Sequence, residues 1–65
     1  MPWNNGDRVR VHAGPNEGTD YDWHGERGAV VRDHENGWVE IRFDKKLAHW
    51  PSRQTTIVHH NVVAE

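Results

Sequence analysis

Apolar and polar side chains alternate along several short segments of this chain, with the two-residue period of a β-strand that is buried on one face. In segment 38–44, the clearest case, the inward positions are Val39, Ile41 and Phe43. Segment 8–13 has the same period, with Val9 and Val11 pointing inward. Both segments are therefore predicted to be strands that cover one core.

Three more segments are rich in β-branched residues, and they predict strands at 28–33, 54–58 and 61–64. An Asn-Gly pair at 36–37 tolerates the positive φ of a hairpin turn. Between the last two strands, His59 and His60 fit a single helical turn. Five short strands in 65 residues predict one all-β domain over residues 1–65, a small five-stranded SH3-like barrel.

Two polar segments connect these strands. Residues 14–25 include three glycines and predict one long loop, and residues 45–53 predict a second loop. The predicted interior consists of Val9, Val11, Val30, Val31, Val39, Ile41, Phe43, Leu47, Ile57, Val58, Val62 and Val63. A chain of this length buries only a small core, so its free energy of unfolding is expected to be small. The sequence leaves the oligomeric state open.

The composition provides no disulfide or thiolate metal site that would stabilise this core. The chain contains no cysteine, so it has neither disulfides nor thiolate metal sites. No apolar run approaches the ~20 residues of a membrane-spanning helix, and the first residues lack the pattern of a signal peptide. We therefore expect a cytoplasmic protein without a membrane partner.

Aromatic and acidic side chains alternate in the 14–25 loop. In an extended segment, Tyr21 and Trp23 share one side, and Asp20 and Asp22 share the other. Aromatic rings beside carboxylates suit a cationic or proline-rich ligand, through cation–π contacts and ion pairs. In the alternative interpretation, Trp23 closes the open end of the barrel and the acids are only solvated.

Tryptophan is abundant for so small a core, with four residues in the chain. Trp38 is predicted on the outer face of its strand near Arg42, a combination typical of protein interfaces, although the ring fits equally well over its own hairpin or on a base. Trp50 lies in the second loop, and loops at one end of a barrel cluster in space. A protein or peptide is the expected partner, and the predicted binding residues are Tyr21, Trp23, Trp38, Trp50, Asp20, Asp22 and Arg42.

The charge balance makes nucleic acid the less favoured partner. Eight lysines and arginines stand against ten acidic residues, a net charge of −2, whereas binding to phosphate backbones draws on a basic excess. A local basic face is still compatible with this total. The residues predicted to form it are Arg8, Arg10, Arg32, Arg42 and Lys45.

Neither a metal site nor a catalytic site is predicted. The six histidines show no metal-binding spacing, and the adjacent His59 and His60 would point apart in a strand. The chain has no nucleophile elbow, phosphate-binding loop or cysteine–histidine pair. We therefore expect no catalytic residue, no cofactor and no enzyme activity.

Two short motifs resemble known families of SH3-like barrels. The run GDRVRV at 6–11, followed by HGERGAV at 24–30, resembles the KOW pattern of ribosomal proteins and transcription elongation factors, which implies RNA or protein binding. The start GDRVR also resembles the plasmid-borne type II dihydrofolate reductases, tetramers with a shared central active site. Their Val-Gln-Ile-Tyr run is missing at 54–59, so an oligomeric enzyme with an interface site is the last alternative.

Three longer motifs are YDWHGERGAV at 21–30, VEIRFDK at 39–45 and HNVVAE at 60–65. They resemble the electron-transport accessory barrels, namely the small peripheral subunit of photosystem I and the variable chain of ferredoxin–thioredoxin reductase. Both are cofactor-free and dock onto a redox partner. The favoured function is therefore a non-catalytic protein-binding or accessory module that uses the 14–25 loop and exposed tryptophans.

Overall fold

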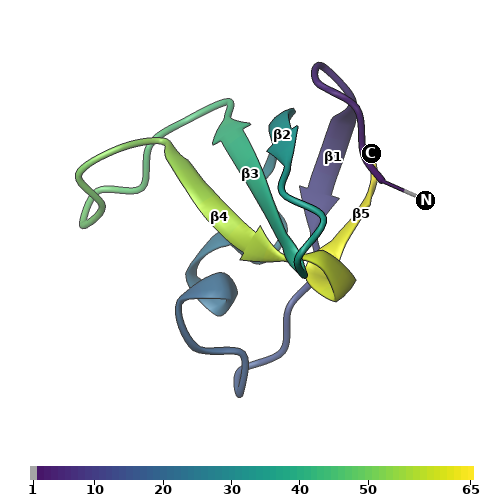
Figure 1. The fold of residues 1–65 in the computed structure, drawn as a ribbon. Coiled ribbons are helices and arrows are strands. Elements are labelled where there is room, and N and C mark those ends of the chain that lie inside the picture. The colour runs from purple at the N-terminus through teal and green to yellow at the C-terminus, as the bar shows by residue number, and fades with distance from the viewer. Residues whose placement is uncertain (1) are drawn as a thin grey trace.

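The computed structural model of the protein describes residues 2–65, and Figure 1 shows its elements. The strands are β1 (Arg8–Val11), β2 (Arg27–Asp33), β3 (Trp38–Phe43), β4 (Gln54–Val58) and β5 (Val62–Ala64). Two short 3-10 helices, η1 (Gly18–Trp23) and η2 (His59–Asn61), complete the fold. The predicted all-β class is confirmed. Neither helix of the described residues has the length and apolar character needed to cross a membrane.

The strands form one antiparallel sheet in the order β4-β3-β2-β1-β5. Strands β1 to β4 are neighbours in chain order, and β5 returns to the other side of β1, where Val63 lies opposite Arg10. The outermost strands are therefore β4 and β5, and the single turn of η2 connects them. In Figure 1 the segment between β1 and β2, which contains η1, extends below the strands.

The predicted strands agree with the observed ones in number and in approximate bounds. Strand β4 has the predicted bounds, and the predicted turn at His59 and His60 forms the start of η2. The 14–25 segment differs, because six of its residues form η1 and are not an irregular loop. A 3-10 helix this short carries no extended hydrophobic period, so the polar composition of the segment concealed it.

The core lies between the inner face of the sheet and η1. Trp23 of η1 is fully buried and stacks on Phe43 of β3, with ring centroids 4.0 Å apart and an interplanar angle of 10°. This ring pair attaches η1 to the sheet. The buried hydrophobic side chains are Val9, Val11, Ala13, Trp23, Val30, Val39, Ile41, Phe43, Ile57 and Val62.

Three valines that were predicted inside are only half-buried, namely Val31, Val58 and Val63. The first lies at an irregularity of β2, where the register with β3 shifts and the strict alternation is lost. The other two alternate with the buried Ile57 and Val62, so they point to the outer face. Leu47 packs against the core from the second loop and stays half-buried.

The connecting turn and a close approach at Gly28 hold β2 and β3 in register. In the connecting turn, φ is positive at Gly37 (98°) and also at Glu35 (58°), whose N–H donates to Asp33 Oδ1 at 2.8 Å. Gly28 of β2 lies so close to β3 that a Cβ atom would be 2.5 Å from the carbonyl oxygen of Arg42. Only glycine permits this approach of the two strands.

Candidate functional site

The conformation of η1 determines which side chains of the long loop reach solvent. A 3-10 helix has three residues per turn, so side chains two residues apart point in different directions. Tyr21 is accordingly 47% exposed, whereas Trp23 is fully buried. The prediction that the two rings share one side is wrong, because it assumed an extended segment. Trp23 belongs to the core and is not available to a partner.

Asp20, another predicted binding residue, is buried and serves the structure. Its Oδ2 atom accepts hydrogen bonds from the backbone N–H of Val58 at 3.0 Å and from Asn61 Nδ2 at 2.9 Å. Because Val58 ends β4 and Asn61 ends η2, this carboxylate attaches η1 to both elements. A buried carboxylate with two internal donors offers no face to a ligand, so Asp20 is withdrawn from the binding residues.

The second loop is attached to η1 through Trp50, which is half-buried against the core. Its indole Nε1 donates to Asp22 Oδ2 at 3.2 Å, and its ring is tilted against that of Trp23 at a centroid distance of 5.3 Å. His49 Nε2 lies 3.5 Å from the same Asp22 oxygen. The structure thus brings Asp22 and Trp50 together in a contact that holds the second loop against η1.

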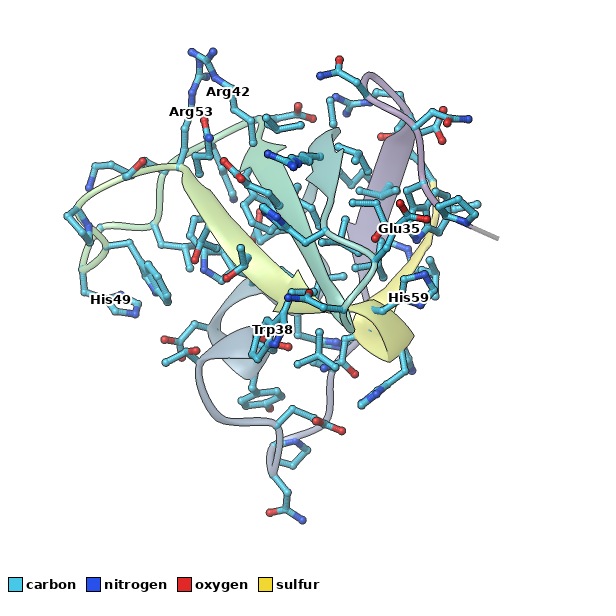
Figure 2. The ribbon with its side chains drawn as sticks, in the orientation of Figure 1. Glu35, Trp38, Arg42, His49, Arg53 and His59 are labelled. Atoms are coloured by element: carbon cyan, nitrogen blue, oxygen red, sulfur yellow. The ribbon has the colours of Figure 1, made fainter. Side chains whose placement is uncertain are left out.

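Trp38 begins β3 on the outer face of the sheet and is 44% exposed. Its cross-strand neighbour is Val58, whose N–H binds Asp20, so Trp38 and η1 lie near the same end of β4. Figure 2 shows Trp38 below that end of β4. Tyr21 and Trp38 are the large hydrophobic side chains that residues 2–65 expose, and we call them the aromatic patch.

Arg42 shares the outer face of β3 with Trp38 but does not adjoin it. The two positions are four residues apart in the chain, which corresponds to about 13 Å along a strand. Figure 2 shows Arg42 and Trp38 at opposite ends of β3. Trp38 and Arg42 therefore do not form one contact site, as predicted, but lie in two separate regions of the sheet.

Carboxylates lie around η1 beside the aromatic patch, and their partners are histidines. Glu17 Oε1, just before η1, lies 3.5 Å from His60 Nε2 of η2, and Asp22 is close to His49. The side chains of Glu17 and Asp22 are 37% and 38% exposed. Within residues 2–65, no lysine or arginine forms an ion pair with either of them. This end of the molecule is therefore acidic.

Two of the five basic residues that were predicted to bind nucleic acid are ion-paired within the chain. The Arg8 guanidinium donates to both carboxylate oxygens of Asp44, at 2.8 and 2.6 Å, and to Glu65 Oε2 at 2.9 Å. These bonds raise the pKa of Arg8 and hold the pKa of Asp44 below its usual range. Lys45 Nζ lies 3.7 Å from Glu26 Oε1.

The other three, Arg10, Arg32 and Arg42, form no ion pair with a carboxylate in the part of the chain that the structure describes. Two arginines outside the predicted set, Arg27 and Arg53, are equally unpaired there and are exposed. The strand period could have found Arg27, because it falls on the outer face of β2. Arg53 precedes β4 in a bend, where no period applies.

A polar network lies on the outer face of β3, between Trp38 and Arg42. Glu40 of β3 accepts a hydrogen bond from Gln54 Nε2, and its other oxygen lies 3.2 Å from His34 Nε2. The bond from Gln54 and then the contact with His34 lower the pKa of Glu40. Among residues 2–65, no group of three or more histidine, aspartate or glutamate side chains is arranged to hold a metal ion.

Comparisons with protein-family models, with curated proteins and with solved structures find no match to this chain. The aromatic patch and the arginines without an ion pair are therefore the features that point to a function.

Proposed function

We propose that this domain is a non-catalytic protein-binding module of the SH3-like barrel type, which docks its partner through the aromatic patch. The strand order supports the barrel, because β4 and β5 are the outermost strands and one helical turn connects them. A strongly curled sheet with this connection brings its two edges together, the arrangement of small barrels.

The exposure of Trp38 carries the binding proposal. Cross-strand pairing with Val58 fixes Trp38 on the outer face, and 44% of the residue stays exposed. A partner that covered so large a ring would gain free energy from its burial. Tryptophan is also enriched among the side chains that dominate binding energies. The half-buried Val58 extends the apolar surface beside the ring.

The partner that fits this end of the domain is an extended peptide segment with arginine or lysine side chains. In the sequence, Tyr21 lies between Glu17, which precedes η1, and Asp22 of η1, and these carboxylates have only histidines as ionic partners. A cation over an exposed aromatic ring gains about 0.5–1 kcal/mol, and a nearby carboxylate adds to the attraction. Proline in the segment would preset its extended conformation.

The other two functions that the sequence left open have less support. Nucleic-acid binding through Arg8 and Lys45 competes with the ion pairs that already hold both side chains. An oligomeric enzyme of the dihydrofolate reductase type would gather reactive groups at a shared interface. Here the histidine–carboxylate contacts of residues 2–65 are separate pairs on different elements.

Selection from a random-peptide display library tests the proposed function. Peptides retained by the immobilised domain are titrated against wild type and Trp38→Ala. We expect the retained peptides to be rich in arginine and lysine. Loss of the Trp38 ring should weaken their binding by about thirtyfold or more, which corresponds to about 2 kcal/mol. The melting temperature should change little, because the ring is not part of the core.

Trp23→Phe is the matched control, since it alters an aromatic side chain of the core. It should lower the melting temperature while the folded protein keeps its affinity for the selected peptides. A library from which the domain retains nothing, or peptides that bind Trp38→Ala as tightly as wild type, would contradict the proposal.

A further inference from the structure

A cluster of arginines occupies the outer face of the sheet at the end away from the aromatic patch. Arg10 of β1 and Arg27 of β2 are direct cross-strand partners. Both point outward, because Val9 and Val11, the alternate positions of β1, are fully buried. The side chains of the half-buried Arg10 and the exposed Arg27 thus start from neighbouring positions on the outer face.

Two further arginines extend this cluster across β3 to the start of β4. Arg42 pairs with Gln54, and the next residue, Phe43, donates its N–H to the carbonyl of Arg53 at 2.7 Å. Arg53 thus lies opposite Phe43, just before β4, and Figure 2 shows Arg42 and Arg53 near each other at the same end of the sheet. We call Arg10, Arg27, Arg42 and Arg53 the arginine face.

The chain's own carboxylates neutralise the arginine face only in part. Asp44 lies beside it, and its backbone carbonyl accepts a hydrogen bond from Arg53 at 3.5 Å. Both side-chain oxygens of Asp44, however, bind Arg8, and so does Glu65. Four other carboxylates contact histidines, namely Glu17, Asp22, Asp33 and Glu40. Asp44 also attracts Arg27 and Arg53 electrostatically, but within residues 2–65 none of the four guanidiniums forms an ion pair with a carboxylate.

This arrangement destabilises the free protein. Like charges directly opposite one another in an antiparallel pair are unfavourable, and Arg10 and Arg27 occupy such a pair. An anion that bridges the two side chains would remove this repulsion. The arginine face is therefore better satisfied with a bound polyanion than without one.

The type of cation favours nucleic acid over an acidic peptide. Both lysines are engaged, because Lys45 contacts Glu26 and Lys46 Nζ donates to the carbonyls of Leu47 and Trp50. The unpaired cations of the face are thus arginines only. A guanidinium binds phosphate through a planar fork and also stacks on bases, whereas an acidic peptide uses only the first of these properties.

We propose that the arginine face binds the phosphodiester backbone of a single-stranded nucleic acid, on a surface separate from the aromatic patch. Three strand spacings of about 4.8 Å place the four arginines within roughly 15 Å, a span that a flexible strand can follow. The net charge of −2 and the adjacent Asp44 limit the affinity, so binding is weak and strongly salt-dependent.

Fluorescence anisotropy with a labelled mixed-sequence DNA oligonucleotide of about a dozen nucleotides tests this assignment on the full chain. Four phosphate contacts give a slope of about −2.8 for log affinity against log salt, or roughly a fiftyfold loss between 50 and 200 mM salt. Arg27→Gln and Arg53→Gln should each reduce the slope by about 0.7. The double variant should retain a slope of about −1.4, or a roughly sevenfold loss.

Lys45→Gln is the matched control, because it removes one charge from a side chain that contacts Glu26 and lies outside the arginine face. Its slope should stay near that of wild type. The assignment would be overturned if Lys45→Gln reduced the slope as much as the arginine variants do, or if the double variant kept the wild-type slope. Absence of binding at about 50 mM salt would also overturn it. Labelled poly-glutamate that binds as tightly as the oligonucleotide would identify an acidic-peptide surface and overturn nucleic acid as the occupant.

Discussion

At the scale of single residues, the four tryptophans show how one residue type takes several roles in a small core. Trp23 is fully buried, Trp3 and Trp50 pack partly buried against the core, and Trp38 is exposed. The strand period predicted the outward position of Trp38, because that period depends only on neighbours in the chain. The burial of Trp23 could not be predicted in this way, since it depends on a 3-10 helix and on contact with Phe43.

Gly28 is the residue at which a single added carbon should be most harmful. A Cβ atom there would lie 2.5 Å from the Arg42 carbonyl oxygen and 2.8 Å from the Phe43 Cα atom, and both belong to the backbone. Gly28→Ala should destabilise the domain by about 1–3 kcal/mol, because neither strand can yield without losing its register. Urea denaturation measures the change.

Gly14→Ala is the matched control for this substitution. No atom lies within 4 Å of a Cβ added at Gly14, so the free energy of unfolding should change by less than about 1 kcal/mol. Equal stabilities of the Gly28 and Gly14 variants would show that the close approach of β2 and β3 is not required.

At the scale of elements, η1 links parts of the molecule that are distant in the chain. Trp23 attaches it to β3, Asp20 to the ends of β4 and η2, and Asp22 to Trp50 in the second loop. The same contacts leave Tyr21 pointing outward. The position of the aromatic patch therefore depends on the attachment of η1, which the sequence interpretation as a loop did not predict.

The edge of β4 is also protected by side chains. The N–H of Val58 binds Asp20, and the N–H of Gln54 donates to Ser52 Oγ at 3.1 Å. Exposed strand edges invite pairing with other chains, and donors that are already bonded reduce that risk. These bonds give Asp20 and Ser52 roles that their positions in the sequence did not reveal.

Asp20→Ala tests the attachment of η1. The substitution leaves the Val58 N–H and the Asn61 amide without their acceptor, and an unpaired buried donor costs about 1–3 kcal/mol. The variant should unfold at lower urea concentration, and hydrogen exchange at the Val58 amide should accelerate. Asp22→Ala, which loses more exposed contacts, should cost less than about 1 kcal/mol. If both variants were equally stable, Asp20 would not be the attachment.

At the scale of the whole molecule, the small net charge conceals two regions of opposite sign. Carboxylates whose ionic partners are histidines lie around η1, whereas arginines without an ion pair lie on the outer face of β1 to β3. The total of −2 made nucleic acid the less favoured partner, but a sum contains no positions and is compatible with a local basic face. The separation arises from pairings such as Arg8 with Asp44, which are 36 residues apart.

Acid should destabilise the domain through three carboxylates. Backbone N–H groups of Trp3 and Glu35 lower the pKa of Asp33, Gln54 and His34 lower that of Glu40, and Arg8 lowers that of Asp44. Their ordinary values are 3.8 for aspartate and 4.5 for glutamate, so as pH falls the unfolded chain binds protons first. Their contribution to stability is therefore complete above about pH 5 and is lost as pH falls through the folded-state pKa values.

Thermal melts between about pH 7 and pH 3 measure this loss. We expect a nearly constant melting temperature down to about pH 5 and a decline below it. Asp44→Asn should show a shallower decline, because one of the three groups no longer titrates. A melting temperature that stayed constant or rose below pH 5 would show that these carboxylates are not held by their partners in the folded state.

The sequence by itself determined the five strands, the inward faces of β1 and β3 and the outward position of Trp38. Such properties follow from backbone period and side-chain polarity, which act between residues one to four positions apart. Only the tertiary structure decided that Trp23 and Asp20 are buried, that Arg8 is neutralised and that Arg10 and Arg27 lie side by side. These outcomes depend on strand register and on contacts between distant segments, and no local period encodes which distant partner a side chain will meet.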